Sequence, residues 1–240
     1  MDKKYELLEN DTITVADSII LYRIRALHNF NDVKAGDLGG YIQSVRNLEI
    51  RLNTINNAWI YDNATVYENA CVYGNARICG NAKVFGDSRI FDNAWVYGKA
   101  RVSGTSRVFE YAKVFDNAWV QDDTRVFGNA SVFGDIRIFD RVWLHDYASA
   151  NGGTIRGDAH INSDAIILNP ASYTTFSPIG SRYDTVTFFR TASSGIWVNV
   201  GCFSGNIDTF KKAVKDRHCD NKFAKQYYAA IPLAESILCD

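Results

Sequence analysis

The sequence predicts an all-β repeat fold, a left-handed parallel β-helix of hexapeptide repeats with about seven coils. An aliphatic residue recurs at an unbroken spacing of six from Ile60 to Leu144. A small residue (Ala, Ser or Thr) stands four positions after each of them, from Ala64 to Ala130. Three hexapeptides close one triangular coil of about 18 residues, whereas a propeller repeats at about 40 residues and an α-solenoid lacks such short strands.

The residues between the two inward positions fit the corners of such a coil. The first is usually Gly or Asp and the second usually Asn or Asp, as in Gly74-Asn75 and Asp116-Asn117. These residue types tolerate positive φ. The period shortens by one residue near Asn151-Gly152-Gly153, and we expect the winding to loosen or turn there.

Residues 1–46 are expected to form an N-terminal β cap for a solenoid body at 47–168. Strands are predicted at Thr12–Val15 and Ile19–Leu27, followed by the glycine-rich segment at Gly36–Tyr41. An open end of a β-helix exposes apolar side chains and unpaired strand edges, so repeat proteins need such a cap.

Residues 169–240 no longer follow the repeat and predict a small C-terminal ββαα domain. Thr185–Phe189 and Ile196–Val200 alternate like the two strands of a hairpin. Two helices are expected after them, from Ile207 to about Arg217 and from Phe223 to about Leu238. Pro232 should kink or split the second helix.

Composition excludes several classes of function. With 26 basic and 27 acidic side chains the net charge is −1, so bulk DNA, RNA or anionic membrane binding is not expected. The chain has no long apolar stretch and its start lacks the apolar segment of a signal peptide, which favours a bacterial cytoplasmic location. The five cysteines are widely spaced without a C-x-x-C pair, so free thiols are expected rather than a disulfide framework or a structural zinc site.

Several segments resemble the YdcK-like hexapeptide-repeat proteins that are common in prophages. They are Tyr22–Leu27, Asp32–Ile42, the Asn-Ala-Trp-Ile/Val-Tyr repeats and Gly201–Gly205. The similarity spans nearly the whole chain. It implies a β-helix with both ends capped, a phage or prophage source, and a transferase label that rests largely on fold analogy, which does not settle function.

Aromatic and arginine side chains fall into ladders when the sequence is sorted by 18. Stacked rings and neighbouring guanidiniums can hold a base and its phosphates. The alternative is that the rings satisfy one another or lie in a subunit interface. A second face is equally aromatic, so a homotrimer with three inter-subunit grooves is expected. The candidate ligand-binding residues are Arg89, Arg107, Arg125, Tyr73, Phe91, Phe109 and Phe127.

Only weak candidates for catalysis are present. Hexapeptide acyltransferases generally need a histidine general base and a projecting loop, and the coils here carry no insertion. His145 and His160 are the candidates on the solenoid, and His145 also continues an aromatic ladder. With four histidines in all, two of them (His28 and His218) in the ends, metal catalysis is not expected, nor is any cofactor.

Three hypotheses remain open at this point. The first is a non-enzymatic, trimeric phage-type binding protein that sequesters a small anionic or nucleotide ligand, for example a host signal, as a counter-defence. The second is an acyltransferase that uses an acyl-CoA donor. The third is a structural or protein-binding β-helix.

Overall fold

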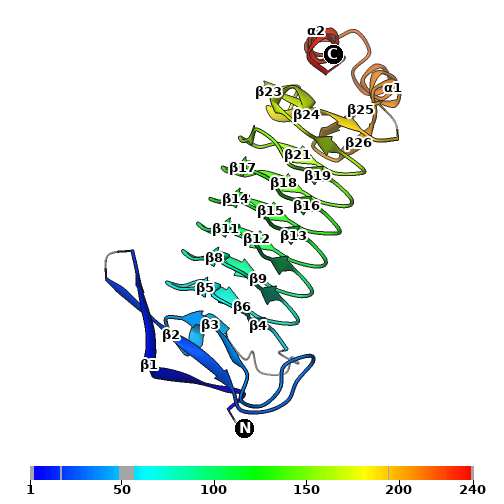
Figure 1. Ribbon diagram of the computed structural model, residues 1–240. Coiled ribbons are helices and arrows are strands. Elements are labelled where there is room, and N and C mark those ends of the chain that lie inside the picture. Colours follow the sequence, from blue (N-terminus) through cyan, green and yellow to red (C-terminus); the bar gives the residue numbers. More distant parts are fainter. Residues whose placement is uncertain (1–2, 17, 49–56, 194, 239–240) are drawn as a thin grey trace.

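The computed structural model describes residues 3–16, 18–48, 57–193 and 195–238. A parallel β-solenoid forms the body of the molecule (Figure 1). A β-hairpin covers its N-terminal end, and an antiparallel sheet with two helices covers its C-terminal end (Figure 1). The all-β repeat fold is therefore confirmed.

The solenoid has three faces, each a parallel sheet of two-residue strands. The cap face continues the N-terminal sheet and contains β3 (Leu38–Ile42), β5 (Thr65–Val66), β8 (Lys83–Val84), β11 (Arg101–Val102), β14 (Trp119–Val120), β17 (Arg137–Ile138) and β20 (Thr154–Ile155). The ladder face contains β6 (Cys71–Val72), β9 (Arg89–Ile90), β12 (Arg107–Val108), β15 (Arg125–Val126), β18 (Trp143–Leu144) and β21 (His160–Ile161). The third face contains β4 (Trp59–Ile60), β7 (Arg77–Ile78), β10 (Trp95–Val96), β13 (Lys113–Val114), β16 (Ser131–Val132), β19 (Ser149–Ala150) and β22 (Ile166–Ile167).

The core is the column of inward side chains that the repeat predicts. Every aliphatic position from Ile60 to Leu144 is fully buried, and so is every small position from Ala64 to Ala130. In the described part of the chain these strands make six complete coils, from β4–β6 to β19–β21, and β22 begins another. The expected number of about seven is thus one complete coil too many.

The shortened repeat at Asn151–Gly153 neither loosens nor turns the winding, so that expectation was wrong. The strands above it pair 17 residues from their neighbours, as in Trp143 with His160, instead of 18. Gly152 makes the shorter corner possible, because a Cβ there would lie 1.9 Å from the carbonyl oxygen of Leu168. The strand pairing therefore continues on all three faces through the slip.

Most corners that lack glycine carry an acidic residue whose carboxylate accepts a backbone N–H of the next coil, Ser163 being an exception. Glu110 has φ +58°, and its Oε2 accepts the backbone N–H of Gly128, one coil away, at 2.8 Å. Asp62 accepts the N–H of Gly80 in the same way at 2.8 Å. The acidic side chain thus compensates for a backbone conformation that residues other than glycine disfavour.

Substitution of Glu110 tests this arrangement. We expect Glu110→Ala to lower the free energy of unfolding by about 1–3 kcal/mol, because it loses the hydrogen bond and keeps the left-handed backbone. Glu110→Gly should cost less, because glycine adopts this φ without strain. Urea denaturation of both variants measures the difference, and equal losses would show that backbone strain contributes nothing.

The N-terminal segment caps the first coil. β1 (Tyr5–Val15) pairs antiparallel with β2 (Ile19–Ala26), β2 pairs with β3, and β3 runs parallel to β5. The two strands predicted there are confirmed, and β1 begins earlier than expected. A short 3-10 helix at Val45–Leu48 completes the cap, and its Asn47 amide donates to the carbonyls of Glu68 and Ala70 at 3.0 and 2.9 Å.

The C-terminal segment contains more strands than the sequence suggested. The predicted hairpin forms the two middle strands, β24 (Asp184–Thr191) and β25 (Gly195–Val200), of a four-stranded antiparallel sheet. The missed outer strands are β23 (Tyr173–Ile179) and β26 (Phe203–Asn206), and a second 3-10 helix at Pro170–Ser172 precedes β23. Phe189 of β24 is buried in the solenoid core, so this sheet closes the upper end.

Two helices pack on the C-terminal sheet, as predicted. Asn206 caps the N-terminus of α1 (Ile207–His218), where its side chain accepts the backbone N–H of Thr209. α2 (Lys222–Leu238) runs past Pro232 as one helix. The proline therefore does not split it. No helix in the described ranges is both long and apolar enough to span a membrane. None of the four described cysteines forms a disulfide with another described residue, and Cys239 lies outside the described residues.

Candidate functional site

The three arginines predicted from the repeat lie in register on the ladder face. Arg107 is paired with Arg89 on one side and with Arg125 on the other in the parallel sheet. Arg89 and Arg107 are exposed and Arg125 is half-buried. None of the three forms an ion pair with a described acidic residue. Neighbouring like charges in a sheet repel one another, so this arginine ladder is an uncompensated cationic strip.

Aromatic rings run beside the arginine ladder in the same face. Tyr73, Phe91, Phe109, Phe127 and His145 stack with centroids 4.6–5.0 Å apart and interplanar angles of 10° or less. Each ring covers the face of the next, so a planar ligand cannot enter between adjacent rings unless the coils separate. The aromatic ladder therefore offers ring edges to a ligand, except at its ends.

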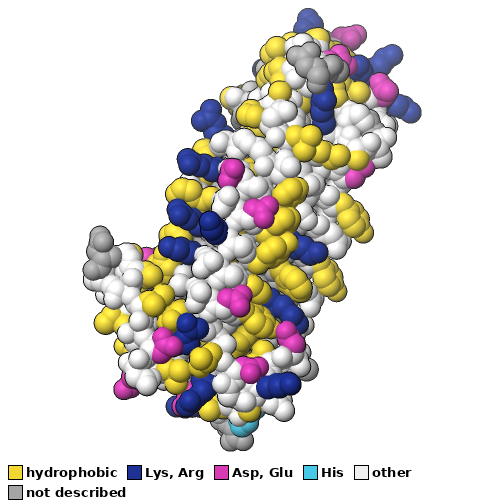
Figure 2. Space-filling model, viewed as in Figure 1, with side chains coloured by type: hydrophobic (Ala, Val, Ile, Leu, Met, Phe, Trp, Pro, Cys, Tyr) yellow, Lys and Arg dark blue, Asp and Glu magenta, His cyan; other side chains and the backbone are white. Residues whose placement is uncertain are grey.

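Stacking also lowers the exposed apolar surface of the solenoid. The rings of the aromatic ladder, and those of Tyr97, Phe115 and Phe133 on the third face, are all half-buried. Figure 2 shows the hydrophobic side chains as a column along the solenoid, with Lys and Arg side chains gathered along one edge. Stacking thus covers part of the apolar surface that suggested a trimer, and the homotrimer stays a prediction.

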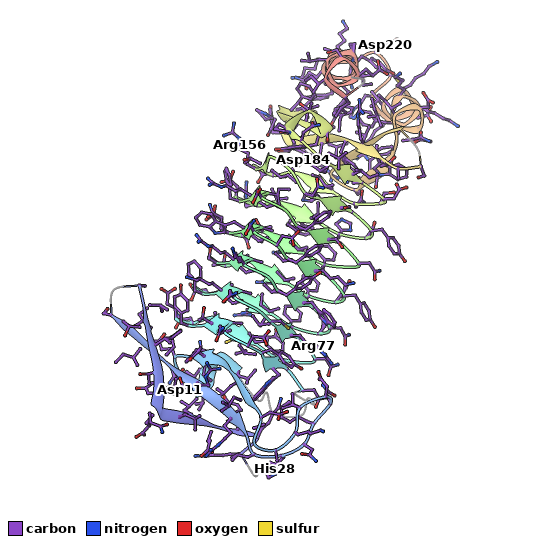
Figure 3. All side chains as sticks on the ribbon, in the orientation of Figure 1. Asp11, His28, Arg77, Arg156, Asp184 and Asp220 are labelled. Carbon is purple, nitrogen blue, oxygen red and sulfur yellow. The ribbon has the colours of Figure 1, made fainter. Side chains whose placement is uncertain are left out.

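A groove opens where the upper coils meet the C-terminal sheet, and we call it the junction groove. Its volume is about 450 Å³, and Asp184, at the start of β24, lies on its wall (Figure 3). Two predicted residues, Arg125 and His160, line it together with Trp143. The Arg125 guanidinium lies 4.5 Å from the Trp143 ring centroid, and the Trp143 and His160 rings stack at 4.7 Å. The Nε of Arg125 is buried and has no hydrogen-bond partner among the described residues.

The groove is richer in hydrogen-bond acceptors than the arginine ladder below it. Its acidic residues are Asp123, Asp158 and Asp184, and its basic residues are Arg125 and Arg141. Arg141 pairs with Asp158 at 2.7 Å, whereas Asp123 and Asp184 form no ion pair with a described residue. Cationic and acceptor-rich surfaces therefore meet at Arg125.

The two histidine candidates have different surroundings. His145 does not line the groove, and its Nδ1 lies 3.0 Å from the carboxylate of Asp146. His160 lines the groove, and its backbone is held by Thr187, which accepts its N–H, and by Asn199, which donates to its carbonyl. Burial lowers the pKa of His160, with nearby His145 and Arg125 adding to the effect. A neutral imidazole is thus favoured at this position.

The lowered pKa predicts a pH dependence of stability. Between the ordinary histidine pKa of 6.5 and the lower folded value, the unfolded chain binds more protons than the folded one. The free energy of unfolding should therefore fall as the pH drops through this window and level off below the folded pKa. His160→Phe keeps a ring on Trp143 and removes the titration, so its urea-denaturation profile between pH 7.5 and 5 should be flatter than that of the wild type. Parallel profiles would contradict this.

Sequence reasoning missed Trp143, Arg141, Asp123 and Asp184 as parts of the site. Sorting by 18 places Ile161 beside Trp143, whereas the 17-residue coil places His160 there. The signal was the one-residue deletion at Asn151–Gly153, after which sorting by 17 would have found the pair. Asp184 comes from the C-terminal sheet, whose position no repeat predicts.

Comparison with known families agrees with the coil geometry. The model of the YdcK β-solenoid repeat matches residues 58–74, which contain β4, β5 and β6 and thus form one complete coil. A comparison with curated proteins gives no match. The matched coil is followed by five more of the same construction in the described chain, so the solenoid is similar to the YdcK β-solenoid repeat over the matched coil.

Proposed function

We propose that the protein is a non-enzymatic binding protein for a nucleotide or a related ligand with several phosphates. The observation that carries this proposal is the uncompensated arginine ladder of Arg89, Arg107 and Arg125, which ends in the junction groove. A row of like charges that no acidic residue neutralises is stabilised by a bound polyanion.

The chemistry of the two surfaces suggests how such a ligand lies. Guanidiniums bind phosphate oxygens in a bidentate manner, and three rungs of a parallel sheet span about 10 Å, which suits several linked phosphates. In the groove, the carboxylates of Asp123 and Asp184 can accept hydrogen bonds from amino or hydroxyl groups of a base or sugar. The phosphates would lie on the ladder and the nucleoside in the groove.

Sequestration of a host nucleotide signal is the role we favour for such a protein. No described loop projects from the tightly packed coils to close over the ligand and catalyse its conversion. The aromatic ring edges beside the ladder suit contact with another subunit. In a homotrimer the ladder would line an inter-subunit groove, which would enclose the phosphates.

Calorimetric titration with ATP, inorganic triphosphate and adenosine as probes tests the proposal. We expect ATP to bind most tightly, triphosphate more weakly, and adenosine weakest, with affinity that falls as salt rises. Native mass spectrometry of the protein from bacterial cytosol gives the subunit number and any retained nucleotide. Equal binding of ATP and adenosine, or no binding of any probe, would move the conclusion to a structural or protein-binding role.

Acyl transfer is the second candidate, and His160 is the observation that favours it. Its neutral imidazole lines an open groove, where a general base could act. No described side chain forms a hydrogen bond with the ring to orient it, so the geometry of a catalytic base is incomplete. Consumption of acetyl-CoA by the wild type that is lost in His160→Ala would support an acyltransferase. If the wild type leaves acetyl-CoA unchanged in the presence of small amine and alcohol acceptors, the binding protein is supported instead.

A further inference from the structure

A second cavity lies inside the C-terminal unit, between its sheet and the two helices. Its volume is about 240 Å³, which is below the usual 300–1,000 Å³ of sites for drug-sized ligands. It shares Asp184, Val200 and Gly201 with the junction groove, so one wall separates the two. We call it the helix pocket.

One side of the helix pocket is apolar and held in place by ring packing. Phe210 of α1 contacts Phe203 at a centroid distance of 5.2 Å and Tyr227 of α2 at 5.5 Å in an edge-to-face arrangement. Ala213 and Val214, one turn further along α1, extend the same surface. The wall is thus formed before any ligand arrives, which lowers the cost of binding.

The other side carries two arginines. Arg182 comes from the turn between β23 and β24, and Arg217 from the last turn of α1. Neither forms a hydrogen bond or ion pair with another described residue. A basic side chain in a last turn also stabilises the helix dipole. Lys215 can do that equally, yet Lys215 does not line the pocket, whereas Arg217 and the neighbouring His218 do.

The charged residues that line the pocket also restrict the net charge of a ligand. Asp184 is the one acidic residue among the described residues of the lining, and with Arg182 and Arg217 it leaves one positive charge in excess. A single negative charge matches this excess, whereas a dianion would approach Asp184 at greater cost. Tyr227 also lines the pocket, and burial raises the pKa of its hydroxyl, which keeps that group neutral.

From this geometry we infer that the helix pocket binds a small organic carboxylate with an apolar or aromatic body. The carboxylate lies between Arg182 and Arg217, and the body lies against Phe210, Ala213 and Val214. A volume of about 240 Å³ equals roughly eight water molecules at about 30 Å³ each, so the ligand has on the order of ten non-hydrogen atoms. This site is separate from the arginine ladder and does not depend on the function proposed above.

Fluorine NMR titration of the full chain with 4-fluorobenzoate tests the site, with 4-fluorobenzamide as the uncharged control. We expect saturable binding of the acid, at least tenfold weaker binding of the amide, and at least tenfold weaker binding of the acid to Arg217→Gln. Lys215→Gln, on the same helical turn but outside the pocket, should stay within twofold of the wild type. Equal binding of acid and amide, equal effects of the two substitutions, or no saturable binding would overturn the inference.

Two cysteines provide an independent measurement without any substitution. Cys202 lines the pocket and Cys219 does not, and both are exposed. Saturating 4-fluorobenzoate should slow alkylation of Cys202 by iodoacetamide severalfold and leave Cys219 unchanged, as measured by peptide mass spectrometry. Unchanged alkylation of Cys202 at saturation would place the acid elsewhere. Binding of ATP should be the same in Arg217→Gln and the wild type, which separates this test from that of the arginine ladder.

Discussion

Trp59→Ala is expected to lower the free energy of unfolding by about 3–5 kcal/mol, the range for removal of a buried aromatic side chain. Trp59 is only 1% exposed. Its ring meets Phe30 at 5.3 Å and Tyr5 at 6.2 Å, both edge-to-face. It therefore joins the first coil to two separate parts of the N-terminal cap, and its loss leaves a cavity between them.

The side chains around Trp59 have little freedom to move into that cavity. Lys4 donates its Nζ to the carbonyl of Ala58 at 2.8 Å and lies 3.9 Å from the Phe30 ring centroid. Burial lowers the pKa of this ammonium to about 8. Removal of the indole would bring water to the ammonium and separate it from the rings, so local exposure of β1 and β2 should accompany the loss of stability.

Trp95→Ala is the matched control for this prediction. Trp95 lies on the same face, two rungs above Trp59, and is 42% exposed. Its substitution should change the free energy of unfolding by less than about 1 kcal/mol. Urea denaturation measures both variants, and hydrogen exchange should show faster opening of β1–β3 in Trp59→Ala alone. Equal effects of the two substitutions would mean that the cap does not depend on Trp59.

The contrast between Trp59 and Trp95 also shows where sequence reasoning stops. The spacing of six predicted each inward side chain, because inward and outward positions follow from the strand pleat and the corner residues. It assigned Trp59 and Trp95 to the same outward position, which is correct for both. Only the cap decides that one is buried and the other exposed, and the cap reaches this position through contacts of residues 4–30 that have no period.

Some of the candidate functional residues likewise follow from the repeat period, and others depend on parts of the chain that have no period. The arginine and aromatic ladders follow from a constant coil length, so the sequence predicted their members and their order. The junction groove needs a change of coil length at Asn151–Gly153 and a sheet whose outer strands, β23 and β26, lack clear alternation. Asp184 could therefore not be assigned to a site from the sequence alone, whereas sorting by 17 after the deletion would have placed Trp143 beside His160.

Arg107→Ala is expected to weaken ATP binding about 10- to 100-fold, the equivalent of about 1.5–3 kcal/mol for a lost hydrogen bond to a charged group. Arg107 is the middle rung of the arginine ladder, is exposed, and contacts no described acidic residue. The same substitution removes two repulsive neighbour contacts, with Arg89 and Arg125, so the free energy of unfolding without ligand should stay constant or rise slightly. A residue with a merely structural role would lower both quantities.

Arg101→Ala is the control for this last prediction, because Arg101 lies one strand earlier in the chain, is equally exposed, and belongs to the cap face. Its guanidinium lies 5.7 Å from the Trp119 ring centroid, away from the ladder. ATP affinity should stay within twofold of the wild type in Arg101→Ala, and the dependence of affinity on salt should be shallower in Arg107→Ala, since one phosphate contact fewer is made. If both variants lose affinity equally, the arginines act through the overall charge of the solenoid, and the ladder is not the binding site. If neither loses affinity, ATP binds without the ladder, and the proposal for the ladder is wrong.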